Sequence, residues 1–180
     1  MQVFRAWPYL YDGDAQYEQR YLAAYARSTR SVFVVAFDGD CVVGAATGIP
    51  LSDDDSAFQA PFRQQGIAVH EVFYFGESVL LPECRGQGIG HRSFDEREAH
   101  ACSFGEFRMT AFAAVDRAAD DPRRPSGYRS NDALWSKRGY VRRDDLHMQL
   151  AWKELGEAEE SEKSLTFWLR VIPDSGNPGS

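Results

Sequence analysis

The chain has 180 residues and a formal net charge of −7; 43% of its residues are hydrophobic and 13% aromatic. These values fit one folded domain with a real core and argue against a disordered chain. No run approaches the roughly 18 apolar residues of a membrane span, no basic and apolar leader opens the chain, and no basic stripe interleaved with aromatics favours nucleic acid. Three cysteines without a C-x-x-C pair favour neither a disulfide framework nor a metal site. We therefore expect a cytoplasmic protein without nucleic-acid, membrane or metal partners.

The first part of the chain predicts one helix followed by mostly extended segments. The helix places Tyr17, Tyr21 and Tyr25 on one face. Asp38-Gly39-Asp40 predicts the turn of a hairpin. The expected helix, the two hairpin strands, a loop with a short helix, and one long strand span residues 14–27, 31–37, 41–50, 53–66 and 70–81.

The second part predicts a central helix to about residue 103 and a return to strands. A loop rich in Pro and Arg over 120–130 leads to a short helix that Gly139 ends as a C-cap. The expected strands are residues 107–115, 147–155 and 165–172, and the short helix is 131–138. We assign residues 1–172 to a single domain and expect 173–180 to be a disordered tail.

The segment Arg85-Gly86-Gln87-Gly88-Ile89-Gly90 lies where the long strand gives way to the central helix. Glycines let the backbone approach a ligand closely, and the first N–H groups of a helix have no partner within it. Such a turn favours an anion, here a diphosphate, with Arg85 as an added cation. The spacing fits neither the dinucleotide fingerprint, since His91 stands at its last glycine position, nor a P-loop, since no Gly-Lys-Ser/Thr occurs.

The pattern that remains, [QR]-x-x-G-x-[GA], resembles the signature loop of the GNAT acetyltransferase superfamily. The stretch from Val79 to Gly90, V-L-L-P-E-C-R-G-Q-G-I-G, is similar to that family's V-x-x-P-x-x-R-G-x-G-I-G. Residues 131–140 resemble its N-x-A-x-x-x-Y-x-K-x-G-F neighbourhood. The resemblance implies an α/β fold with a mixed, largely antiparallel sheet flanked by helices. The family's first strand is missing or abbreviated here, so we expect either a truncated chain or a start codon assigned late.

The resemblance implies that acetyl-CoA is the co-substrate and that the turn holds its diphosphate. Backbone groups of Val79, Leu80 and Leu81 would pair with the pantetheine arm as an added strand would, and the residues from Arg85 to Gly90 would take the diphosphate. Asn131 would either contact the cofactor arm or cap the short helix.

The resemblance also implies a carboxylate base on the strand before the turn, and Glu77 is the candidate. Many relatives carry a tyrosine that acts as the general acid where this chain has Trp135. The indole N–H of Trp135 cannot protonate a thiolate. Tyr128 is the nearest phenol in the sequence and the candidate acid, although solvent can also protonate the thiolate. Residues 7–13 and the tyrosine face after them would wall the acceptor, with Asp12 near a cationic amine, or would simply pack the core.

The function expected is thus acetyl transfer to a primary amine, carried by a small molecule or a peptide, by direct attack in a ternary complex. The alternative is a catalytically silent CoA-binding sensor, and a third reading is a binder of another nucleotide. A shortened first strand also allows two chains to pair as a homodimer.

Overall fold

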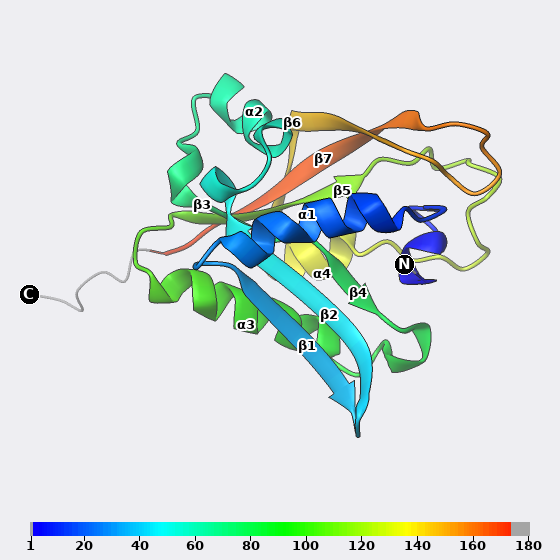
Figure 1. Ribbon diagram of the computed structural model, residues 1–180, viewed down its shortest axis with the longest axis horizontal. Coiled ribbons are helices and arrows are strands. Elements are labelled where there is room, and N and C mark those ends of the chain that lie inside the picture. The colour runs from blue at the N-terminus through cyan, green and yellow to red at the C-terminus, as the bar shows by residue number, and fades with distance from the viewer. Residues whose placement is uncertain (1, 174–180) are drawn as a thin grey trace, which may run out of the picture.

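The computed structural model describes residues 2–173, and within this range it leaves out the side chains of residues 2, 15–18 and 20. The side chain of Tyr17 and the expected tail from residue 174 onward therefore lie outside the description. Seven strands form one sheet in the order β1-β2-β3-β5-β7-β6, with β4 paired to β2 off this path (Figure 1). The strands are Val32–Asp38 (β1), Cys41–Pro50 (β2), Val72–Tyr74 (β3), Ser78–Leu80 (β4), Met109–Val115 (β5), Val141–Trp152 (β6) and Ser161–Val171 (β7). The α-helices are Ala15–Arg27 (α1), Ser56–Gln64 (α2), Ile89–Ser103 (α3) and Asp132–Lys137 (α4).

The sheet is mixed but largely antiparallel, as the sequence predicted. Only β3 and β5 pair in parallel; the other neighbouring strands run antiparallel. Side chains of β3 alternate between two cores, because successive residues of a strand point to opposite faces. Val72 and Tyr74 join the core that contains Phe62 of α2, whereas Phe73 joins the core that contains Phe94 of α3. Helices thus cover both faces of the sheet.

The expected long strand over 70–81 is wrong, because the chain breaks into β3 and β4 at Gly76. Phe75 still donates its N–H to Ala111 of β5 at 2.7 Å, but beyond this point the chain leaves β5. Thr47 of β2 binds the break on both sides: its N–H donates to the carbonyl of Glu77 at 3.0 Å, and its carbonyl accepts from Gly76 at 3.2 Å. β4 then continues on β2 alone, through pairs such as Ala45 with Val79. A gap therefore opens between β4 and β5.

The N-terminal segment forms no regular strand within the part of the chain that the structure describes. A short 3-10 helix, Gln2–Arg5 (η1), precedes a single bridge between Tyr11 and Glu154. The carbonyl of Leu10 accepts from Leu155 at 2.8 Å beside it. Among the described residues the N-terminal segment thus contributes one bridge, near the β6–β7 hairpin, and β1 forms an edge of the sheet.

The last two strands are longer than predicted. β6 begins at Val141 rather than at residue 147, and its pairing with β7 shifts between Arg143 and His147. The shift and the charged stretch around it conceal the strand alternation in the sequence. The short helix α4 ends as predicted, with Gly139 at φ +85° and its N–H bonded to Ser136 at 2.9 Å.

Candidate functional site

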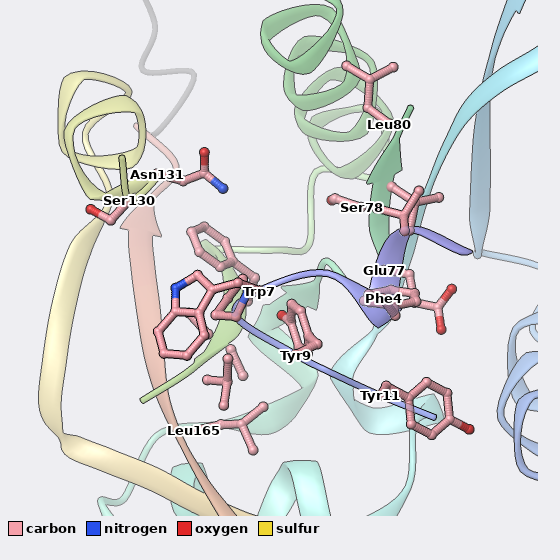
Figure 2. A pocket seen from close by; sticks show the side chains of 18 of the residues that line it. Phe4, Trp7, Tyr9, Tyr11, Glu77, Ser78, Leu80, Ser130, Asn131 and Leu165 are labelled. Carbon is pink, nitrogen blue, oxygen red and sulfur yellow. The ribbon is translucent and has the colours of Figure 1, made fainter. Parts of the chain in front are cut away.

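A cavity of about 1800 Å³ occupies the gap that opens where β4 leaves β5. Its wall comes from the N-terminal segment, β4, the glycine turn, the start of α3, β5, α4 and the β6–β7 hairpin. Pockets for drug-sized ligands measure about 300–1,000 Å³. The cavity therefore has room for a large cofactor together with a second molecule. Figure 2 shows Trp7 and Tyr9 in its middle, with Asn131 on one side and Glu77 and Ser78 on the other.

β4 presents one free edge to the cavity. Among the described residues it pairs with β2 alone, and Val79 and Leu80 line the cavity. Leu81 does not: its N–H already donates to the carbonyl of Val43 at 2.9 Å. Hydrogen-bonded pairs alternate along an antiparallel ladder, and Glu77 and Leu81 both bond to β2, so Val79 between them also turns its backbone to β2. The open side belongs to Ser78 and Leu80, and the carbonyl of Leu80 already accepts from Arg85 at 3.3 Å. The backbone of Ser78 and the N–H of Leu80 are therefore available to an extended ligand laid between β4 and β5.

The glycine turn lies at the same cavity and opens α3. Gly86 and Gly88 adopt left-handed backbones with φ of +75° and +82°, which side-chain-bearing residues rarely adopt. A Cβ atom added at Gly86, Gly88 or Gly90 would meet nothing within 4 Å. The turn and the dipole of a 15-residue helix together favour an anion at this place.

The two side chains of this turn differ in position. Arg85 is exposed, lines the cavity, and donates from Nε to the carbonyl of Leu80 at 3.3 Å. Gln87 lies outside the cavity lining and donates to the carbonyl of Glu83 at 3.3 Å. Arg85 is therefore the side chain of the turn that is placed to meet an anion.

Glu77 and Tyr128, the candidate base and acid, both line the cavity together with Tyr9. Burial, reinforced by the nearby Glu77 and Tyr128, raises the pKa of Tyr9 to about 12. Burial likewise raises the pKa of Tyr128, an effect that Asp132 reinforces and that the positive charges of Arg124 and Arg85 oppose. Both phenols hold their protons at neutral pH, so either one is able to donate a proton within the cavity. Sequence reasoning named Tyr9 only as part of the acceptor wall.

The N-terminal segment walls the cavity, as residues 7–13 were expected to do, except that Leu10 does not line it. Arg117 holds this wall in place, with Nε donating to the carbonyl of Pro8 at 2.7 Å and Nη2 to that of Tyr9 at 3.2 Å. Trp152 donates to the same Tyr9 carbonyl at 3.1 Å. The backbone of the wall is thus fixed to the loop that follows β5 and to the end of β6, and the rings of Trp7 and Tyr9 lie at the cavity.

Asp12, expected near a cationic amine, already has two cationic partners. Arg5 lies 3.3 Å and Lys153 3.5 Å from its carboxylate. Glu77 also belongs to the cavity wall, and its charge acts on the phenol of Tyr9.

Asn131 lines the cavity and does not cap α4. It precedes the helix with φ −82° and ψ 0°, and its side chain makes no capping hydrogen bond, so the capping alternative is wrong. Trp135 packs between Phe112 and Trp168, with ring centroids 4.9 and 5.2 Å away. Its ring thus serves the aromatic core beneath the cavity.

Tyr21 lines the cavity and its hydroxyl group pairs with that of Tyr25, which does not; the sequence does not indicate this pair. The hydroxyls of Tyr21 and Tyr25 lie 2.8 Å apart, above Gly76. Burial raises the pKa of both phenols well above its usual value. The tyrosine spacing was noticed in the sequence, but nothing there placed Gly76 against it.

Arg97 of α3 also lines the cavity and is only 1% exposed. Its guanidinium lies 4.4 Å from the ring centroid of Phe75 and 4.8 Å from that of Phe94, and it donates to the carbonyl of Thr47 at 3.3 Å. Burial lowers its pKa to about 10. Nothing in the sequence separates this arginine from the exposed Arg92 of the same helix.

No group of three metal-ligating side chains occurs among residues 2–173. Within the same range, no helix combines the length and the apolar character that a membrane crossing requires.

Comparisons with known proteins agree with this geometry. A family model described as the acetyltransferase (GNAT) family matches residues 4–124. No curated protein sequence matches the chain.

Several solved structures are similar in fold. An aminoglycoside 6'-N-acetyltransferase complexed with coenzyme A is 17% identical, with TM-score 0.57 over 97% of this chain and 90% of the other. A ribosomal-protein-alanine N-acetyltransferase from Brucella melitensis is 15% identical, with TM-score 0.56 over 89% and 80%. A GNAT acetyltransferase from Elizabethkingia anophelis with acetyl-CoA bound is 14% identical, with TM-score 0.55 over 91% and 86%. At these identities the likeness concerns the fold.

Proposed function

Because the chain belongs to the acetyltransferase (GNAT) family, we propose that it is an acetyl-CoA-dependent enzyme that acetylates a primary amine by direct attack in a ternary complex. The observation that carries this proposal is that one cavity holds both the open edge of β4 and the glycine turn of α3. Two of the similar proteins were solved with acetyl-CoA or coenzyme A. The three cysteines form no disulfide, and we expect the reaction to take place in a reducing compartment, the cytoplasm.

The cofactor would lie along β4 with its diphosphate at the turn. The N–H of Leu80 and the backbone of Ser78, on either side of Val79, suit an amide-bearing arm, and the first N–H groups of α3 suit the diphosphate. Arg85 adds a cation at the rim, and the amide of Asn131 faces the same cavity. Acetyl-CoA would supply an activated acetyl group, so the protein's task is to position it beside the amine and to move protons.

Glu77 is the proposed base and Tyr128 the proposed acid. An amine bound against Tyr9 and Trp7 would lose a proton to Glu77 before or during attack. Tyr128 would return a proton to the thiolate that leaves. Its raised pKa means that the phenol carries this proton at neutral pH, and also that it is a weaker acid than a free tyrosine. Tyr9 is a second phenol at the same place and the internal alternative to Tyr128.

A catalytically silent CoA-binding module is the second candidate, and one observation favours it. Trp135, at the position of the family's tyrosine, is committed to packing against Phe112 and Trp168 and offers no acid. Under this reading the chain binds CoA and shows no turnover with any amine.

The cofactor site is tested by placing a negative charge in the turn. Asp tolerates a left-handed backbone better than most residues, and in Gly88→Asp its carboxylate would repel a diphosphate. Two like charges about 5 Å apart at a protein surface repel each other by roughly 3 kcal/mol, which corresponds to a loss of more than 100-fold in affinity. Calorimetry should therefore show at least a 100-fold loss of CoA affinity.

Gly66→Asp is the matched control for that variant. Gly66 has a similar φ of +69° and equally open space, but it lies outside the cavity lining. The control should bind CoA as the wild type does, and Gly88→Asn should lose much less affinity than Gly88→Asp. If Gly88→Asp keeps its affinity, the turn is not the diphosphate site. Competition by ATP as strong as that by CoA would favour the reading of another nucleotide binder.

Catalysis is tested by following free thiol with acetyl-CoA and a panel of small amines and peptide N-termini. Glu77→Gln and Tyr128→Phe should each lower kcat by about 10²–10⁴-fold, the usual contribution of an acid or base. The affinity for CoA should stay unchanged in both. Tight CoA binding without turnover across the panel would support the silent module instead.

A further inference from the structure

Arg97 of α3 is a buried cation without a counterion among the described residues. It is 1% exposed, and no carboxylate in the described part of the chain forms an ion pair with it. Glu98, the next residue, instead pairs with Arg138 and Arg170. Nη2 of Arg97 is buried and has no hydrogen-bond partner within the same range. Burying an unpaired charge destabilises a fold, so this cation is more typical of a functional site than of a structural core.

The guanidinium of Arg97 lies where the gap between β4 and β5 begins. Nη1 donates to the carbonyl of Thr47 at 3.3 Å, and the N–H of Gly76 donates to the same carbonyl at 3.2 Å. Gly76 is the break after which β4 leaves β5, and both Gly76 and Arg97 line the cavity. The cation therefore stands at the start of the gap.

The cofactor proposed above would bring its thioester toward this point. With the diphosphate at the glycine turn, the arm would run along β4 from Leu80 to Ser78, toward the break at Gly76. Along α3, nine residues separate Gly88 from Arg97, which corresponds to roughly 13 Å at about 1.5 Å per residue. The thioester ends the arm, so it is the part of the cofactor that approaches Arg97.

We propose that Arg97 stabilises the negative charge that acetyl transfer places on the thioester. The amine nitrogen bonds to the thioester carbonyl carbon and gives its proton to Glu77, while the electron pair of the C=O bond moves to oxygen. The return of this pair breaks the C–S bond and releases a thiolate, which takes a proton from Tyr128 or water. A cation that is shielded from water stabilises both anions. The inference rests on the proposed function.

The surroundings of Arg97 leave its charge in place at neutral pH. Burial lowers its pKa to about 10. The titratable and charged groups that also act on it are Tyr140, Glu98, Tyr25 and Arg138. The rings of Phe75 and Phe94 lie against the guanidinium but supply no negative charge that would cancel its own. The sulfur therefore becomes a better leaving group, and the reaction depends less on a strong acid at Tyr128.

The test measures the ionisation of the thiol of bound CoA, which a merely structural arginine would not change. Thiolate absorbance in the ultraviolet, read from about pH 6 to 10 against the protein without CoA, follows this ionisation. In the wild type the acid dissociation constant of the bound thiol should be at least about tenfold higher than in free CoA, because a neighbouring cation lowers the pKa of a thiol.

Arg97→Met removes the charge and keeps the volume of the side chain. In this variant the acid dissociation constant should fall back at least about tenfold and kcat should fall by about 10²-fold, while the affinity for acetyl-CoA stays unchanged. Arg92→Met is the matched control, since it removes a charge from the same helix at an exposed side chain outside the cavity lining. It should leave both the thiol and kcat unchanged.

A second variant keeps the test valid if Arg97→Met does not fold, as judged by circular dichroism. Arg97→Gln also removes the charge and should give the same two results. A bound thiol that ionises as in free CoA, or equally in the wild type and the uncharged variant, would overturn the inference and leave the proposed acetyl transfer intact. Absence of CoA binding would overturn both. A shifted thiol without turnover on any amine would contradict the proposed catalysis and, with it, the role of Arg97 in it.

Discussion

Gly76 is the position where a single methyl group should disturb the site most. The residue stands at the break between β3 and β4, beneath the paired hydroxyls of Tyr21 and Tyr25. A Cβ atom at this position would lie 2.1 Å from the Tyr25 hydroxyl, 2.3 Å from that of Tyr21 and 2.9 Å from Oγ1 of Thr47. Gly76→Ala therefore forces both phenols to move by close to an ångström.

The cost follows from two effects. Overpacking of a well-packed interior costs about 1–3 kcal/mol, and separating the two hydroxyls, now 2.8 Å apart, adds the loss of a hydrogen bond worth about 1 kcal/mol. The free energy of unfolding should fall by about 2–4 kcal/mol. For a chain of this size that corresponds to a decrease in Tm of roughly 5–15 °C.

Urea unfolding of four proteins measures this effect: the wild type, Gly76→Ala, Tyr25→Phe and the double variant. If the hydroxyls cause the clash, removing one of them should recover at least about 1 kcal/mol, so the double variant is more stable than the sum of the two single losses predicts. Gly90→Ala is the control, since its Cβ would meet nothing within 4 Å, and it should change stability by less than about 1 kcal/mol. Losses that add to within about 0.5 kcal/mol would refute the steric reasoning.

Three further predictions concern buried charges. Burial raises the pKa of Asp54 to about 6, so between pH 4 and 6 the folded chain holds a proton that the unfolded chain releases. The free energy of unfolding should therefore fall by up to about 3 kcal/mol as the pH rises from 4 to 6. Urea titrations of the wild type and of Asp54→Asn over this pH range should show the difference. Glu154 is 1% exposed between two arginines, and Glu154→Gln should lower the free energy of unfolding by about 3–5 kcal/mol. Asp145→Asn, at an exposed ion pair, should lower it by less than about 1 kcal/mol. Equal losses of stability in the two variants would contradict this. The free energy of unfolding of Arg97→Met should stay within about 1 kcal/mol of the wild type, because Met removes a buried charge and keeps the volume. Arg97→Ala leaves a cavity and should lower it by about 2–4 kcal/mol. Thermal unfolding of both variants would disprove this if the Met variant lost as much stability as the Ala variant.

The parts of the fold that could be predicted are those encoded by neighbouring residues. Asp38-Gly39-Asp40 defines its hairpin because turn chemistry is local. The glycine turn from Gly86 to Gly90 defines the start of α3 for the same reason. The mixed sheet was expected from the resemblance that this turn carries to the GNAT family, rather than from the pattern of the remaining segments.

The parts that could not be predicted depend on contacts between distant segments. The break at Gly76 arises because Thr47, some thirty residues earlier, binds both sides of it. Arg97 is buried only because the rings of Phe75 and Phe94 meet over it. The side chain of Asn131 lines the cavity and makes no capping hydrogen bond to α4. The sequence pattern fits both orientations and does not predict which one occurs.

The departure of β4 from β5 has a mechanical consequence. Among the described strands, β3 alone joins β1–β2 to β5–β7–β6, with two residue pairs to β2 and three to β5. We therefore expect the sheet to bend most easily at β3. Amide protons of β3 should exchange with solvent at a rate set by rocking of the two halves. A ligand that lies between β4 and β5 and contacts both strands would restrict this bending, and slower amide exchange in β3 would then indicate that the ligand is bound.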